Sequence, residues 1–217
     1  MKLQDARRDL YRRLAKEQGY KSRAAFKLIE ANEKYHLIRK GDRVVDLGAA
    51  PGGWLQVCSG IVGDSGIVVG LDLRPISVKG SNVRTLKVDV YDESALDRLQ
   101  RLLGGQADVL LSDLASSVSG IWALDHFKQV ELTMRVLLLG ETLLKERGNA
   151  FLKVFEGERS IELKGELSRR FEVVRLMKPR AVRRESAELY YVCFAWKGAA
   201  RTPRTFETDR TASATAE

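Results

Sequence analysis

From residue 43 onward, short apolar runs alternate with segments whose apolar residues recur at helical spacing. The runs are rich in β-branched and aromatic residues, which favours strands. We predict strands at 43–48, 66–73, 84–90, 107–114, 149–155, 172–177 and 189–196. Helices are predicted between them at 53–61, 93–103, 125–147 and 159–171. Near-continuous apolar strands separated by helices indicate an α/β fold with a mostly parallel sheet and helices on both faces.

Two helices precede this pattern, and a polar tail follows it. We expect one helix over 4–17 and a second that begins after Ser22, a good N-cap. Residues 178–188 have the composition of a loop, so the last strand is expected to insert antiparallel. The tail, 198–217, is polar and rich in Thr and Ala, which is typical of disorder. We therefore expect a basic helical segment at 1–40 that packs on the core and a main domain at 41–197.

The composition is that of an ordinary globular protein, with 44% hydrophobic and 30% charged residues among 217. No apolar run approaches the roughly 20 residues needed to cross a bilayer, and the charged N-terminus lacks the apolar stretch of a secretory signal. Cys58 and Cys193 are far apart with no CxxC, and His36 and His126 lack partners at metal-ligand spacing. We expect a cytoplasmic monomer with no membrane contact and no metal.

The net charge of +8 is concentrated at one end of the chain. Residues 1–40 contain 12 Lys or Arg against 5 Asp or Glu, which is nearly all of the excess. A polyanion such as nucleic acid is the natural partner, and a solvated helix face is the alternative. The side chains expected to contact it are Arg7, Arg8, Arg12, Arg13, Lys21 and Arg23, with Lys178, Arg180, Arg183 and Arg184 of a second basic segment.

The segment DLGAAPGGW, residues 46–54, joins the first predicted strand to a helix. The strand ends at Gly48 and the helix begins near Gly53, where small residues and unpaired N–H groups allow a ligand to approach. Neither a GK[ST] nor a GxGxxG pattern is present, which disfavours a P-loop and a dinucleotide site. The segment therefore predicts a nucleotide-type site, with a tight strand–helix turn as the alternative.

Four acids, Asp46, Asp72, Asp89 and Asp113, stand near the ends of the first four predicted strands. The carboxyl ends of parallel strands meet at one edge of a sheet, where open α/β sheets bind ligands. Asp72 is placed to accept hydrogen bonds from ribose hydroxyls, and Asp89 to lie near an adenine. Because these acids suit a cationic nucleoside better than a phosphate, they point to S-adenosyl-L-methionine.

A second group of residues lies outside this loop. Lys153 stands within the apolar strand FLKVF, which is costly unless the amine is paired, functional or extended to solvent at the sheet edge. Glu188 opens the last strand. Lys27 taken alone reads as a solvated helix residue. Trp122 and Met134 are expected in the core.

Taken together, YKSRAAFKLIE, VVDLGAAPGGW, LLSDLASSVSG, FLKVFEGE and ELYYV resemble the FtsJ/RrmJ-like RNA 2′-O-ribose methyltransferases over about residues 18–197. The resemblance implies a Rossmann-like, class I S-adenosylmethionine-dependent methyltransferase with a seven-stranded sheet whose last strand is antiparallel. It implies a catalytic tetrad of Lys27, Asp113, Lys153 and Glu188. It places cofactor contacts on Gly53, Trp54, Asp72, Asp89 and Asp113, to which the loop adds Gly48.

One segment departs from the family pattern. Ser116 and Ser117 stand where the family commonly has Pro and Asn, which bears on the RNA-facing loop. We expect Lys153 to act as the base that accepts the 2′-hydroxyl proton, with a protonated, orienting lysine as the alternative. The expected substrate is a uridine of large-subunit (23S-type) ribosomal RNA, with tRNA as the second choice. A non-catalytic RNA-binding assembly factor and a nucleotide-dependent oxidoreductase are the rival classes.

Overall fold

A computed structural model describes residues 3–116, 119–183 and 185–198, with the backbone alone over 3–9. The helices are α1 (Leu3–Glu17), α2 (Ala25–Tyr35), α3 (Gly53–Val62), α4 (Ala95–Leu103), α5 (Trp122–Leu143) and α6 (Ser160–Arg170). The strands are β1 (Arg43–Leu47), β2 (Ile67–Asp72), β3 (Val83–Lys87), β4 (Ala107–Ser112), β5 (Leu144–Phe155), β6 (Phe171–Met177) and β7 (Glu188–Trp196).

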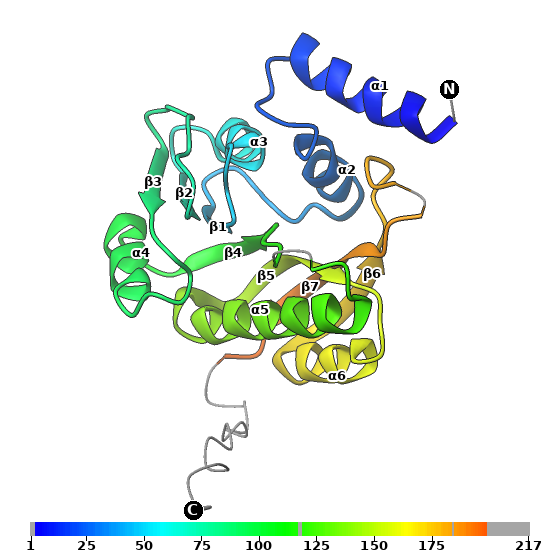
Figure 1. The fold of residues 1–217 in the computed structure, drawn as a ribbon. Coiled ribbons are helices and arrows are strands. Elements are labelled where there is room, and N and C mark those ends of the chain that lie inside the picture. Colours follow the sequence, from blue (N-terminus) through cyan, green and yellow to red (C-terminus); the bar gives the residue numbers. More distant parts are fainter. Residues whose placement is uncertain (1–2, 117–118, 184, 199–217) are drawn as a thin grey trace, which may run out of the picture.

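In the described part of the chain the strands form one sheet in the order β3-β2-β1-β4-β5-β7-β6 (Figure 1). β7 runs antiparallel to both β5 and β6, and the remaining pairs are parallel. This confirms the predicted mostly parallel sheet with an antiparallel last strand. The strand order reverses between β1 and β4, which is where a doubly wound sheet opens a ligand crevice at its carboxyl edge.

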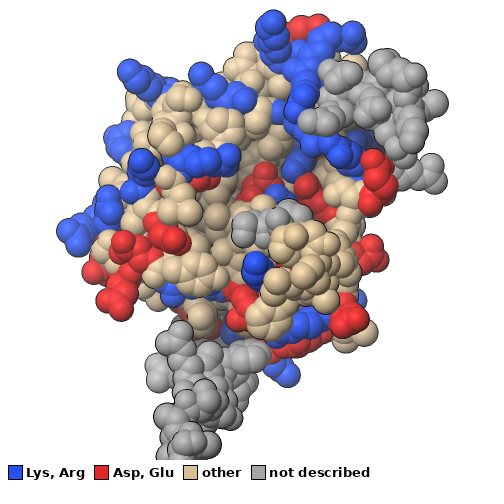
Figure 2. Space-filling model, in the orientation of Figure 1, with Lys and Arg blue, Asp and Glu red and all other residues tan. Residues whose placement is uncertain are grey.

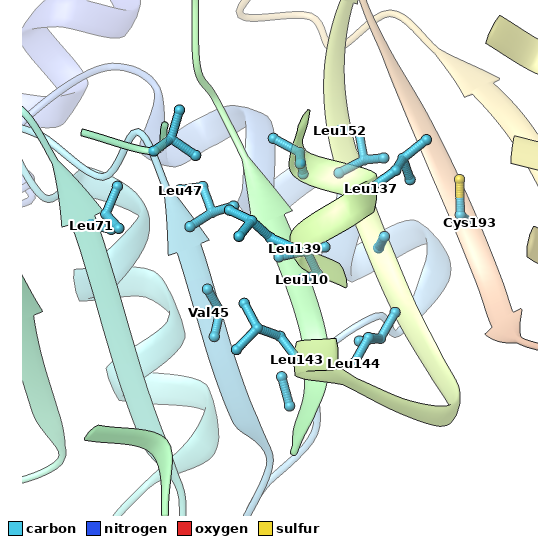
Figure 3. Packing of buried hydrophobic residues seen from close by; sticks show 14 of the residues in the cluster. Val45, Leu47, Leu71, Leu110, Leu137, Leu139, Leu143, Leu144, Leu152 and Cys193 are labelled. Atoms are coloured by element: carbon cyan, nitrogen blue, oxygen red, sulfur yellow. The ribbon is translucent and has the colours of Figure 1, made fainter. Parts of the chain in front are cut away.

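Helices cover both faces of the sheet (Figure 1). On one face α2 and α3 bury Ala25, Leu28 and Leu55 against the sheet. On the other face α4, α5 and α6 pack on side chains such as Leu110 and Leu152 (Figure 3). Both faces of the central strands are therefore buried from solvent, which explains their near-continuous apolar sequence.

The boundary between α5 and β5 differs from the prediction. The helix was expected to continue to Arg147, but it ends at Leu143, and β5 begins at Leu144. Lys145, Glu146 and Arg147 all suit a helix, and Gly148 is the first helix-breaking residue after them, so the sequence pattern places the helix end too late. Pairing of Leu144 with Ala107 draws the chain into the sheet, and Arg147 then takes a left-handed conformation with φ 64° before the regular ladder resumes.

Two further predictions are wrong. Ser22 does not cap α2: the helix begins at Ala25, and its N-cap residue Ala24 makes no side-chain capping bond. Trp122 is not in the core. As the first residue of α5 it is 52% exposed and stacks on His126 and Phe155.

The segment 1–40 does not stand apart from the main domain, since α2 packs on α3. The proposed boundary at residue 40 stays a prediction, and the tail after residue 198 lies outside the described residues. Among the described residues no helix is long and apolar enough to cross a membrane. The same residues contain no group of three or more metal-ligating side chains.

Candidate active site

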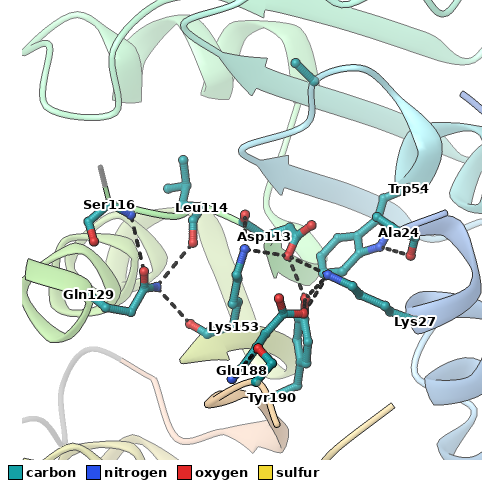
Figure 4. A network of polar contacts seen from close by, with 12 residues as sticks. Ala24, Lys27, Trp54, Asp113, Leu114, Ser116, Gln129, Lys153, Glu188 and Tyr190 are labelled. Carbon is teal, nitrogen blue, oxygen red and sulfur yellow. Dashed lines mark hydrogen bonds and ion pairs between the residues drawn. The ribbon is translucent and has the colours of Figure 1, made fainter. Parts of the chain in front are cut away.

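The four residues of the expected tetrad lie together at the carboxyl edge of the sheet (Figure 4). Lys27 Nζ lies 2.6 Å from Glu188 Oε1 and 3.7 Å from Asp113 Oδ1. Lys153 Nζ lies 3.3 Å from Asp113 Oδ1 and 3.4 Å from the Asp113 carbonyl oxygen. The side chains come from α2, the end of β4, β5 and the start of β7, so only the folded sheet brings them together.

Tyr190 is a member of this cluster that the sequence analysis did not identify. Its hydroxyl lies 2.6 Å from Asp113 Oδ1 and 2.9 Å from Glu188 Oε1, and it accepts a hydrogen bond from Lys27 Nζ at 2.9 Å. Tyr190 follows Glu188 by two positions on β7 and therefore faces the same side of the sheet. That spacing is the only sequence signal for it, because ELYYV otherwise reads as an apolar strand.

The charges of the cluster control its protonation. Burial favours the neutral form of Asp113, but Lys153, Lys27 and the Tyr190 hydroxyl outweigh burial and lower the pKa of Asp113. Burial, together with Asp113 and Glu188, raises the pKa of Tyr190 well above its usual value. Asp113 is thus an anion and Tyr190 a hydrogen-bond donor at neutral pH.

Packing against neighbouring segments requires glycine at two positions of the loop. Gly48 has φ 85°, and a Cβ there would lie 2.8 Å from the backbone nitrogen of Leu114. A Cβ on Gly53 would lie 2.5 Å from Ser22 Oγ. These two glycines are required by the neighbouring segments, and their contact with a cofactor stays a proposal.

A cavity of about 440 Å³ opens beside the loop, between the ends of β2, β3 and β4 and the helix α5. Asp72, Asp89 and Leu114–Ser116 are among the residues that line it. Asp72 accepts hydrogen bonds from the backbone N–H groups of Ala50 and Arg74, at 2.9 and 2.8 Å, which leaves lone pairs for further donors. Asp89 is exposed two residues beyond the end of β3.

Asp46 is an unusual group on β1, directly before the loop. It is fully buried, and neither carboxyl oxygen has a hydrogen-bond partner among the described residues. Burial, with Asp113 and Asp72 nearby, raises its pKa well above the usual value. A bound water at the loop would satisfy these oxygens, and a cationic group there would favour the ionised carboxylate. The residues present therefore fit S-adenosylmethionine, which carries an ammonium and a sulfonium.

Trp54, near the start of α3, is packed inside the protein. Its indole is buried between Phe151 and Tyr190, and its N–H donates to the Ala24 carbonyl at 2.8 Å (Figure 4). It joins α3 to α2 and the core, and it does not line the cavity. The contact of Trp54 with the cofactor stays a proposal.

The structure describes some, but not all, of the basic side chains expected to bind RNA. Arg12, Arg13 and Lys21 are exposed on α1 and the turn after it. Arg23 and Arg183 line a recess of about 360 Å³ that also contains Lys27 and Glu188. The side chains of Arg7 and Arg8 and the whole of Arg184 lie outside the described residues.

The remaining basic side chains, Arg180 and Lys178, are partly engaged within the protein. Arg180 Nε lies 3.8 Å from Glu30 Oε1, and Lys178 Nζ donates to the Ser186 carbonyl at 2.7 Å. Figure 2 shows many basic side chains over the upper part of the molecule and acidic ones at its centre and on both flanks.

The sheet order, the loop at its switch point, the cavity beside it and the adjacent tetrad define a class I S-adenosylmethionine-dependent methyltransferase. The model of the FtsJ-like methyltransferase family matches residues 20–196, and the chain belongs to this family.

Similar proteins agree with this assignment. A protein of Nitrosopumilus maritimus named ribosomal RNA large subunit methyltransferase E is 42% identical, over 91% of this chain and 100% of its own length. The protein of that name from Methanothermobacter thermautotrophicus is 44% identical over 89% and 92%. A crystal structure of a Plasmodium falciparum protein assigned as a ribosomal RNA methyltransferase superposes with TM-score 0.73 at 28% identity, over 82% of this chain and 100% of that one.

Proposed function

We propose that this protein transfers the methyl group of S-adenosylmethionine to a ribose 2′-hydroxyl of large-subunit (23S-type) ribosomal RNA, at a uridine. The observation that carries the proposal is the convergence of Lys27, Asp113, Lys153 and Glu188 beside the cavity. The names of the relatives support ribosomal RNA as the substrate.

Bound S-adenosylmethionine supplies an electrophilic methyl group, and the protein supplies position and proton handling. The Lys153 amine is directed by the carboxylate and the carbonyl of Asp113, which leaves it one further position for the ribose oxygen. In its neutral form the Lys153 amine has a lone pair at this position, and that lone pair accepts the 2′-hydroxyl proton. Alignment of the reacting groups accounts for roughly 7–11 kcal/mol of the barrier in well-oriented systems.

Lys27 and Glu188 form the side of the site that faces RNA. Both line the recess of about 360 Å³ together with Arg23 and Arg183. We assign this recess to the target nucleotide, with the two arginines on its phosphates. Arg12, Arg13 and Lys21 extend the basic surface for the flanking strand.

The experiment is methyl transfer to unmodified large-subunit RNA, both free and in the ribosomal subunit, with 2′-O-methyl positions mapped afterwards. The proposal predicts one modified uridine in the large-subunit RNA. Modification of tRNA alone would favour the second candidate substrate. Absence of transfer to any RNA would favour a non-catalytic assembly factor.

The proposal also covers where the protein works in the cell and its oligomeric state. Cys58 and Cys193 are both buried free thiols, which suits a reducing cytoplasm. We propose that the protein works there as a monomer, and sedimentation of the purified protein tests the assembly state.

A further inference from the structure

Gln129 lies on α5, and its side-chain amide connects the two segments that carry Asp113 and Lys153 (Figure 4). Its Oε1 accepts a hydrogen bond from the Ser116 backbone N–H at 3.3 Å. Its Nε2 donates to the carbonyls of Leu114 and Lys153, at 3.2 and 3.3 Å. The side chain is 2% exposed, so the acceptor and both donors of the amide are used inside the protein.

The location of this amide matters because strand pairing stops just before it. The ladder between β4 and β5 ends with Ser112 opposite Leu152, one residue before Asp113 and Lys153. Beyond that pair side chains join the two segments in place of the ladder: the Gln129 amide, and the contacts of Lys153 Nζ with Asp113. Lys153 is therefore held at both ends: Gln129 binds its carbonyl and Asp113 binds its amine.

The same amide also reaches the cofactor cavity. Leu114, Ala115 and Ser116 line that cavity, and Gln129 binds the first and the last of them. One side chain thus holds a wall of the cavity and the backbone of the expected base in a single hydrogen-bond network.

We propose that Gln129 is a positioning residue that fixes the cofactor cavity relative to Lys153, so that the methyl donor and the base are aligned. It acts through the backbone of residues 114–116 and 153, not through contact with substrate. The inference rests on the proposed methyl transfer.

The test replaces Gln129 by Met, which keeps the length and apolar stem but removes all three hydrogen bonds. A displacement of about 1 Å can cost about 100-fold in rate, so we expect kcat to fall about ten- to 100-fold. The KM for S-adenosylmethionine should rise about five-fold, the equivalent of one hydrogen bond. The KM for RNA should stay within about two-fold of wild type, because the RNA-facing recess is untouched.

Asn82→Leu is the matched control. The Asn82 amide likewise joins two carbonyls, those of Ser59 and Gly63 at 3.1 and 2.9 Å, but it precedes β3 at the opposite edge of the sheet. This variant should lose stability and keep kcat. Equal losses of kcat in both variants, or wild-type kcat and KM in Gln129→Met, would overturn the proposal.

Two further measurements keep the test decisive. Gln129→Glu retains the acceptor but not the donors, so it should lose kcat as Gln129→Met does; wild-type kcat would refute the donor role. In the wild-type protein, the Gln129 side-chain amide protons should exchange slowly with solvent, and their NMR chemical shifts should change when S-adenosylhomocysteine binds. Exchange as fast as at the exposed Gln100 would also refute it. Failure of the proposed function shows instead as absent transfer by wild type, while the amide measurements still test Gln129.

Discussion

Replacing Tyr190 by Phe removes one oxygen atom from the centre of the charged cluster. The hydroxyl lies within 2.9 Å of Lys27, Asp113 and Glu188, and the residue is fully buried. The ring should stay in place, because its stacking on Phe151, with centroids 4.6 Å apart, does not involve the hydroxyl. The perturbation is therefore confined to hydrogen bonding.

The magnitude follows from the number and charge of the lost bonds. A hydrogen bond to a charged group contributes about 1.5–3 kcal/mol. The neighbours stay paired with one another, since Lys27 still contacts Glu188 at 2.6 Å, so the three losses do not add. We expect about 2–3 kcal/mol of lost stability, which lowers Tm by about 4–12 °C for a chain of this size. A loss of about 1.4 kcal/mol in the alignment of Asp113 would lower kcat about ten-fold.

Calorimetry and steady-state methyl transfer measure the two effects, and Tyr191→Phe is the control. Tyr191 is adjacent on β7 but faces the other side, where its hydroxyl reaches only the Ser160 carbonyl at 3.4 Å among the described residues. It should cost less than about 1 kcal/mol and leave kcat unchanged. Equal effects of the two substitutions would show that the Tyr190 hydroxyl has no special role in the cluster.

Three other outcomes are expected. Lys153→Arg keeps the positive charge but cannot take up a proton, so kcat should fall more than about 100-fold if Lys153 is the base; a loss below about ten-fold would leave it an orienting role only. The raised pKa of Asp46 means that the folded state binds more protons than the unfolded one, so stability falls as pH rises above 3.8; Asp46→Asn should flatten this fall in urea titrations, and an unchanged slope would contradict the assignment. Arg12→Gln and Lys21→Gln should each lower the salt-dependence slope of RNA binding by roughly one unit, and a constant slope would remove them from the RNA surface.

The sequence predicts much of the fold because both faces of the sheet are buried. Each central strand appears as a run such as RVVDL or ADVLLS, and each interruption marks a helix. The end of α5 escapes this reasoning, since the charged residues 145–147 suit a helix as well as an exposed strand end, and only the pairing of Leu144 with Ala107 shows that β5 has begun.

The site is predictable where a residue conflicts with its surroundings. Lys153 is conspicuous because a lysine in an apolar strand is costly, and Asp113 because it follows a strand directly. Lys27 carries no such conflict, and only the family resemblance identifies it. Tyr190 and Gln129 are inconspicuous for the same reason: an aromatic residue suits a strand and a glutamine suits a helix, so their hydrogen bonds become visible only in the folded protein.

The most direct test of the active-site assignment compares wild type with Lys153→Ala in two assays on the same preparations. Transfer of labelled methyl to large-subunit RNA should drop to background in the variant. Calorimetric affinity for S-adenosylmethionine should stay within about two-fold, because Lys153 does not line the cavity that we assign to the nucleoside. Undiminished transfer, or a loss of cofactor binding as large as the loss of transfer, would contradict the assignment.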